Sequence, residues 1–235
     1  MHNNNIASVL TRTDTWRGHS QRLPRSTIAT GHSHLDRLLQ GGWPVSALSE
    51  LLPQQPGIGE LSLLLPTIKY YADNHQLCVW LDPPYQPYAP TLVAAGIALD
   101  KLLIVRSKSP AEWLWAAEQS IRSGALLLAW TKQKLPRYAD LRKLQLAAAN
   151  SNNAAFLFSA PNALAAPSPV ALRLELQSLQ VNQLLLTVRK MRGTASGEQL
   201  QLRLGEASTQ RTAFTQLPAD RHHGYSNHAV LSLNS

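Results

Sequence analysis

Between residues 46 and 159 the sequence alternates short apolar runs with segments long enough for helices, and this alternation constrains the fold most. The runs are mostly continuous in hydrophobicity, which is typical of strands buried on both faces of a parallel sheet. The runs cover 46–52, 76–82, 102–106, 125–130 and 154–159, and the helix-length segments cover 60–73, 87–96, 110–123 and 137–150. Ser109 before Pro110 indicates a capped helix start. Strands alternating with helices predict β-α-β units with right-handed crossovers.

The pattern changes after residue 170. Apolar and polar residues now alternate over 171–179, 182–190 and 198–204, as expected for an antiparallel meander with one face in water. We therefore predict an α/β domain over residues 26–205, with a mostly parallel sheet flanked by helices and a C-terminal antiparallel meander. Residues 1–25 are polar and basic and predict a flexible arm, and the low hydrophobic density of 206–235 predicts a flexible tail.

Composition narrows the environment and the partners. The chain of 235 residues carries a formal net charge of +8, which favours an anionic partner such as nucleic acid or an acidic protein face. The single cysteine, Cys78, lies in an apolar run, so we expect a buried core residue and a reducing compartment. No apolar stretch reaches the roughly 18–20 residues that a membrane span needs. The N-terminus has no secretory signal pattern, so we expect a cytoplasmic protein.

A loop follows the first of these strands and has the outline of a phosphate-binding loop. In the pattern G-x-x-x-x-G-K-[ST], backbone amides wrap the phosphates, the lysine neutralises them and the hydroxyl binds magnesium. The segment "PQQPGIGE" places Gly59 at the lysine position and Glu60 at the hydroxyl position. Pro53 and Pro56 lack an N–H, and a carboxylate at Glu60 repels a phosphate. The degenerate positions are Pro53, Pro56, Gly57, Gly59 and Glu60, and we predict no catalytic residue and no cofactor there.

Two further features of this region bear on nucleotide chemistry. Asp82 is the one acid at the end of a predicted strand, and two prolines follow it. Pro66 falls inside the helix pattern after the loop, where it removes a hydrogen bond and predicts a kink. Neither feature restores a magnesium ligand at the expected strand, which ends in Trp130 and Thr131. We therefore predict a protein that is not an enzyme.

The histidines do not predict a metal site. His32 and His34 flank a serine on a predicted loop, before a helix that contains Asp36. The others singled out, His222, His223 and His228, lie in the predicted tail. No cysteine or carboxylate stands at a spacing that would complete a tetrahedral site with them.

Two basic clusters are candidate contact sites. Arg189, Lys190 and Arg192 crowd a predicted strand end, with no acid nearby until Glu198. They are either a solvated hairpin end or a contact with nucleic acid or an acidic partner. Trp16 and Arg17 form an aromatic and cationic pair on the predicted arm, and such residues are enriched as interface anchors.

Several ordered motifs carry a family resemblance. "TGHSHLDRLLQGGWPVSALSELL" resembles the opening of a RecA-type core, and "QLCVWLD" and "LLLTVRKMRG" resemble its second strand and its late basic strand end. Together with "WRG", "PGIGELSLLLP" and the ending V-x-K-x-R-G, the chain is similar, from Trp16 to Gly193, to the ImuA family of SOS mutagenesis proteins. Pro53 departs from the glycine that many relatives carry at that position.

The resemblance implies a RecA-like domain without a working ATP site. It implies a non-enzymatic accessory of translesion DNA synthesis, acting at the nucleoid with an ImuB-like, Y-family-related protein and an error-prone DnaE-type polymerase. RecA and DNA are further candidate contacts. The alternative is a division inhibitor of the related SulA family, whose partner is FtsZ. The "WRG" arm and the "TVRKMRG" strand end favour the mutagenesis branch.

Overall fold

The computed structural model of the chain describes residues 26–131, 135–191, 194–205, 214–215 and 230–232. Within these residues a nine-stranded sheet has the order β11-β10-β9-β3-β8-β7-β4-β6-β13. Its strands are β3 (Ala47–Pro53), β4 (Cys78–Leu81), β6 (Leu102–Arg106), β7 (Leu126–Trp130), β8 (Ala154–Phe158), β9 (Leu172–Gln180), β10 (Gln183–Met191), β11 (Gln199–Arg203) and β13 (Val230–Ser232). The neighbours from β9 to β13 pair in parallel, and β9, β10 and β11 pair antiparallel. The predicted α/β fold with a C-terminal meander is confirmed.

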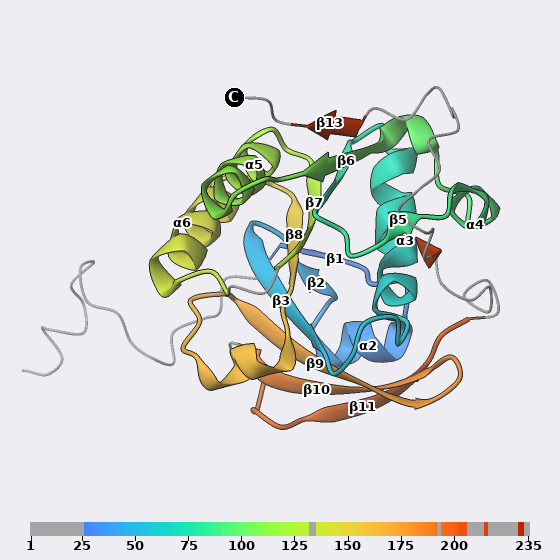
Figure 1. Ribbon diagram of the computed structural model, residues 1–235. Coiled ribbons are helices and arrows are strands. Elements are labelled where there is room, and N and C mark those ends of the chain that lie inside the picture. The colour runs from blue at the N-terminus through green and yellow to red at the C-terminus, as the bar shows by residue number, and fades with distance from the viewer. Residues whose placement is uncertain (1–25, 132–134, 192–193, 206–213, 216–229, 233–235) are drawn as a thin grey trace, which may run out of the picture.

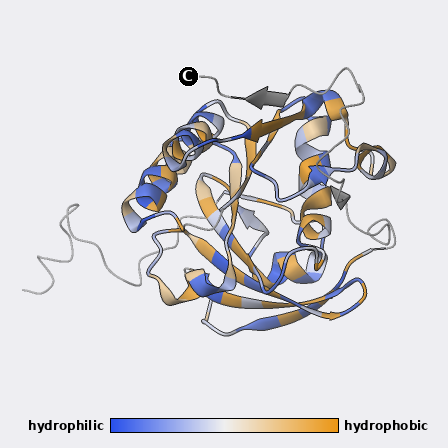
Figure 2. Cartoon of the chain, viewed as in Figure 1, coloured by the Kyte–Doolittle hydropathy of each residue, from blue (hydrophilic) through white to orange (hydrophobic). Residues whose placement is uncertain are grey.

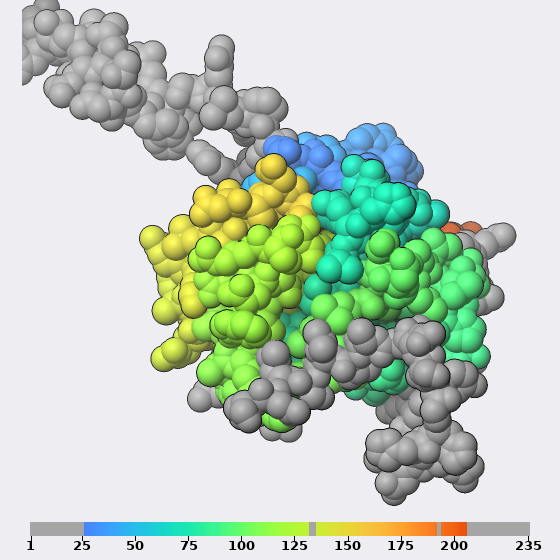
Figure 3. Space-filling view, turned by 90° about the horizontal axis from the view of Figure 1, so that it is seen from above, coloured from blue at the N-terminus to red at the C-terminus, as the bar shows by residue number. Residues whose placement is uncertain are grey.

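Helices cover both faces of the sheet (Figure 1). The helices are α2 (Ser33–Leu38), α3 (Glu60–Asp73), α4 (Ala89–Ala94), α5 (Pro110–Arg122) and α6 (Tyr138–Ala149), with 3₁₀ turns η1 (Leu99–Lys101) and η2 (Pro161–Ala165). One apolar core lies between the sheet and α2, α3 and α4, and a second lies between the sheet and α5 and α6. Seen from above, α5 and α6 lie on one side of the molecule and α3 and α4 on the other (Figure 3).

The hydropathy of each strand follows its burial. The parallel strands are apolar along most of their length, whereas the meander strands alternate apolar and hydrophilic residues (Figure 2). All five residues of β7 and of β8 are buried, but β11 has a single buried residue, Leu202. A strand covered on both faces must be apolar throughout, and a strand with one wet face must alternate. The sequence pattern therefore located the helical layers as well as the strands.

Two short ribbons lie beside the main sheet. β1 (Thr27–Ile28) pairs with β2 (Trp43–Pro44), and β5 (Gln86–Pro87) pairs with β12 (Phe214–Thr215). β12 and β13 fall within 206–235, for which the sequence predicts a flexible tail. β13 pairs in parallel with β6, so this segment contributes an edge strand to the main sheet. The predicted arm, residues 1–25, lies outside the described residues.

The T-G-x-x-x-L-D motif has structural roles around α2. The Thr30 amide donates to Asp36 Oδ1 at 2.7 Å, which ties the approach of the chain to the helix. Gly31 has φ +84°, and a Cβ there would lie 2.4 Å from Cβ of Pro66. Pro66 lies inside α3, which runs from Glu60 to Asp73. The helix begins at Ser33, with His32 as an N-cap that makes no side-chain capping bond. The prediction of a loop for Ser33 and His34 is therefore wrong, because the bond from the Thr30 amide to Asp36 holds the preceding segment against a short helix.

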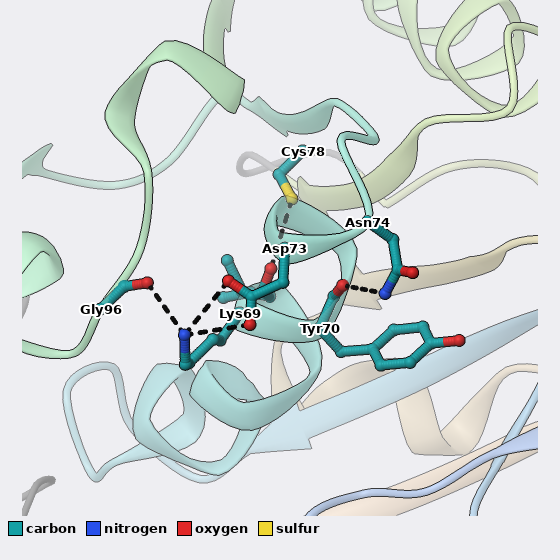
Figure 4. A network of polar contacts seen from close by, with 7 residues as sticks. Lys69, Tyr70, Asp73, Asn74, Cys78 and Gly96 are labelled. Carbon is teal, nitrogen blue, oxygen red and sulfur yellow. Dashed lines mark hydrogen bonds and ion pairs between the residues drawn. The ribbon is translucent and has the colours of Figure 1, made fainter.

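The start of α5 is confirmed as predicted, since Ser109 Oγ accepts a hydrogen bond from the Glu112 amide at 3.2 Å. Cys78 is a buried core residue whose Sγ contacts the Ile68 carbonyl at 3.7 Å (Figure 4). Burial raises the pKa of the Cys78 thiol to about 12, so the thiol is unreactive in the fold. Among the described residues, the helices are all too short or too polar to cross a membrane.

Candidate functional site

The loop between β3 and α3 lies where ligands bind in open α/β sheets. It leaves the carboxyl end of β3, which is flanked in parallel by β8 on one side and β9 on the other. The chain builds the sheet outward from β3, returns to β8, and then continues on the opposite side of β3 with β9. The carboxyl end of a strand at such a reversal is the usual ligand crevice. The fold therefore places residues 54–59 at the usual ligand crevice of such a sheet.

A carboxylate of the protein itself accepts hydrogen bonds from the backbone amides of this loop. Glu60 Oε1 accepts from the Gly57 amide at 2.9 Å, and Glu60 Oε2 accepts from the Gly59 amide at 3.1 Å. Glu60 is 5% exposed, and the two glycines have φ of +82° and +109°, the left-handed conformation that turns their N–H groups inward. The sequence predicts that Glu60 repels a phosphate. In the structure, the Glu60 carboxylate lies where a bound anion would accept hydrogen bonds from the loop amides. The sequence pattern alone did not predict these two hydrogen bonds.

The rest of the loop is closed by packing. The Gln54 amide donates to the Leu176 carbonyl of β9 at 2.9 Å, so the loop begins as an extension of β3. A Cβ on Gly59 would lie 2.8 Å from Cδ1 of Leu204, so the meander packs closely against the turn. Pro53 is the last residue of β3, and Pro56 is exposed on the loop. These contacts anchor the two ends of the turn, at Gln54 and Gly59, while residues 54–57 are exposed.

The Asp82 carboxylate accepts hydrogen bonds from the residue that follows the neighbouring strand. It is 4% exposed, with φ +53°. Asp82 Oδ1 accepts from the Ser107 amide at 2.8 Å, and Oδ2 accepts from Ser107 Oγ at 2.5 Å. β4 and β6 are adjacent parallel strands, so the carboxylate joins their two ends. Among the described residues, no group of three or more His, Cys, Asp or Glu side chains could hold a metal ion.

The basic end of β10 is paired more extensively than the sequence suggests. Arg189 contacts Glu175 Oε2 through Nη2 at 2.6 Å and through Nε at 2.7 Å. The expectation of no nearby acid before Glu198 is wrong, because antiparallel pairing of β9 and β10 brings Glu175 across from this strand end. The Arg189 side chain is still 44% exposed. Arg192, Trp16 and Arg17 lie outside the described residues.

Lys190 turns toward the protein. Its Nζ donates to the Ser168 carbonyl at 2.6 Å. Burial, and then the charge of Arg173, lower the pKa of Lys190, while Glu50 opposes this shift. Both residues are exposed, but Arg189 pairs with Glu175, whereas Lys190 donates to the loop that precedes β9.

A buried ion pair lies behind this loop, and sequence reasoning missed it. Arg173 Nε donates to Glu50 Oε2 at 2.7 Å, and the two side chains are 8% and 2% exposed. Arg173 also donates to the carbonyls of Ala163 at 2.5 Å and Ala166 at 3.0 Å. Glu50 and Arg173 are register partners in β3 and β9. The available signal was a charge, Glu50, inside the otherwise buried strand β3, which requires a partner of opposite charge.

Two cavities open near the N-terminus of α6. The larger, about 460 Å³, lies between the starts of α5 and α6. It is lined by Ser107, Lys108, Ser109, Pro110, Ala111, Trp113, Leu114, Thr131, Leu135, Pro136, Arg137 and Asp140. The smaller, about 210 Å³, lies against the buried ion pair and shares the segment 135–137 with the first. Neither of these two cavities includes the residues of the 54–59 loop.

Comparisons with protein-family models and with curated proteins return no match for this chain.

Proposed function

We propose that this protein is a non-enzymatic accessory of SOS-induced translesion DNA synthesis, with a RecA-like core that no longer uses nucleotide. Its partners would be an ImuB-like, Y-family-related protein and an error-prone DnaE-type polymerase, with RecA and DNA as further contacts. The observation that carries the proposal is the Glu60 carboxylate on the Gly57 and Gly59 amides. A nucleotide would have to displace a buried, hydrogen-bonded anion from the position its phosphates need.

Three features support a binding role over a catalytic one. The loop amides at the ligand crevice are hydrogen-bonded to the Glu60 carboxylate. The Asp82 carboxylate is hydrogen-bonded to Ser107. The motif residues Thr30, Gly31 and Asp36 maintain local structure. The sequence resemblance to the ImuA family supplies the biological context. The exposed Arg189 and Lys190 at the end of β10 are the described part of the proposed partner surface. Trp16, Arg17 and Arg192 belong to the proposed surface on the sequence alone.

The test is co-purification of the full chain with candidate partners. Tagged protein from DNA-damaged cells should retain the ImuB-like and DnaE-type proteins, and Arg189→Glu should reduce their recovery. Arg122→Glu is the matched control, because Arg122 is also an exposed arginine paired with a glutamate, but it lies on α5. Equal recovery with both variants would refute the role of the β10 end.

The same preparation separates the main alternatives. Two results together would support a SulA-like division inhibitor instead. The purified protein would inhibit FtsZ polymerisation, and FtsZ would co-purify with it in place of the polymerase proteins. Saturable micromolar binding of ATP with magnesium would contradict the non-enzymatic proposal directly. Each outcome concerns a different ligand, so one result cannot be mistaken for another.

A further inference from the structure

We propose that the smaller cavity binds a small oxyanion, at a site separate from the 54–59 loop. The cavity of about 210 Å³ is bounded by the sheet, by η2 with the loop after it, and by the start of α6. Its lining residues from the sheet side are Glu50, Ser159 and Arg173, and Ser168 and Arg137 face it from the other segments. One water needs only about 10–15 Å³ of such space, so the volume admits a polyatomic ligand. This proposal does not rest on the proposed function.

Unused hydroxyl groups are the first observation that points to a ligand. Ser159 is 3% exposed, and its Oγ has no hydrogen-bond partner among the residues that the structure describes. Ser168 Oγ is likewise buried and without a partner within the described chain. Buried hydroxyls are almost always hydrogen-bonded, because an unsatisfied one costs stability. Two such groups lining one cavity indicate that something polar occupies it.

The charges around the cavity select the sign of that ligand. Arg173 and Arg137 line it, and each is already paired with a carboxylate, Arg173 with Glu50 and the exposed Arg137 with Asp140 at 3.1 Å. Glu50 already accepts from Arg173 Nε at 2.7 Å. Lys190, which donates to the Ser168 carbonyl, adds positive charge behind the same loop. The two arginine pairs cancel, so Lys190 leaves one positive charge beside the cavity, and unused hydroxyl donors near a positive charge suit the oxygens of an anion.

The remaining walls strengthen such an interaction. Leu135, Pro136 and Leu141 come from the segment that starts α6, and Ala163 and Pro167 come from η2 and its following loop. Apolar walls lower the local dielectric, so a charge-assisted hydrogen bond is stronger here than on an open surface. The ligand class is therefore a small phosphate-like or carboxylate-like anion.

Calorimetric titration of the full chain with inorganic phosphate, at ionic strength matched with chloride, tests the site. Saturable binding is expected, and Ser159→Ala should weaken it about tenfold or more, through loss of a hydrogen bond to a charged group. Without phosphate, the same variant should unfold at an unchanged or higher temperature, since it removes an unsatisfied hydroxyl. Acetate in place of phosphate distinguishes a planar monocarboxylate ligand from a tetrahedral one.

Ser120→Ala is the matched control. Ser120 is also buried, but its Oγ donates to the Ala116 carbonyl at 2.7 Å within α5. This variant should lose stability and keep its affinity for phosphate. If neither anion binds saturably, or if Ser159→Ala binds as well as the wild type, the cavity holds solvent only and the proposal is overturned.

Discussion

Removal of the buried guanidinium by Arg173→Met should destabilise the domain more than any surface change. The substitution leaves the Glu50 carboxylate, 2% exposed, without its charged partner. It also removes the guanidinium donor from the Ala166 carbonyl and leaves the Ala163 carbonyl with its bond from the Ala166 amide at 3.1 Å. Breaking a buried pair by removing one partner costs about 3–5 kcal/mol of the free energy of unfolding. A domain of this size loses roughly 2–4 °C in Tm per kcal/mol. The expected decrease in Tm is therefore about 6–20 °C.

The double variant Glu50→Leu with Arg173→Met decides whether the uncompensated charge is the cause. Replacing both ions with apolar side chains of similar size is often nearly neutral, so the double variant should recover most of the lost stability. Urea unfolding followed by circular dichroism, with the slope of free energy against urea checked for constancy, measures all three proteins. A double variant as unstable as Arg173→Met would refute the reasoning and would assign the loss to the carbonyls of η2.

The Arg189–Glu175 pair provides a surface comparison for this cycle. Its arginine is 44% exposed, and ion pairs in that setting contribute roughly 0–1 kcal/mol. Arg189→Met should therefore change the free energy of unfolding by less than about 1 kcal/mol. The contrast isolates burial as the variable, because both pairs join neighbouring strands through an arginine and a glutamate.

Three further changes have defined outcomes. Glu60→Ala removes the acceptor from two partly exposed loop amides, and we expect the free energy of unfolding to fall by about 1–2 kcal/mol in urea titration. By the same measurement, Gly31→Ala should lower the free energy of unfolding by about 2–4 kcal/mol, because the backbone is left-handed and the new Cβ would clash with the proline ring of α3. Gly197→Ala is the control, since Gly197 is also left-handed but lies in open space, and it should lower the free energy of unfolding by about 1 kcal/mol. The pKa of Glu118 is lowered below 4.5, and hydrogen bonding to Lys143 is the largest cause. The loss of stability in Glu118→Gln should therefore be evident at pH 7 and should disappear as the pH falls below 4.5. A difference in stability that persists at about pH 2 would contradict this.

The strands and long helices were predictable because their signals are local. The helix expected over 60–73 is found at those residues, and the bounds of β3, β4, β6, β7 and β8 agree with the five apolar runs to within two residues at each end. Continuous hydrophobicity reports burial on both faces, which a parallel sheet requires. The weaker local signals were those of α2, β12 and β13, which are short elements stabilised by contacts with distant segments.

The site contacts were less accessible to sequence reasoning because they join residues that are far apart in the chain. Glu50 and Arg173 are separated by 123 positions, and Glu175 reaches Arg189 only through strand pairing. Glu60 shows a different limit. Its position predicts the loss of phosphate chemistry, but its hydrogen bonds to Gly57 and Gly59 depend on backbone conformation. The direction of an amide is not encoded in residue type alone.

The central position of β3 has a consequence for biosynthesis. Its two neighbours, β8 and β9, lie roughly 100 residues later in the chain, so both of its edges stay open while α3 to α6 are being made. At about 5–20 residues per second, this interval lasts on the order of 5–20 s. An apolar strand with unpaired edges is prone to associate with other chains. Residues 47–53 therefore gain both of their pairing strands only after the start of the meander has been synthesised.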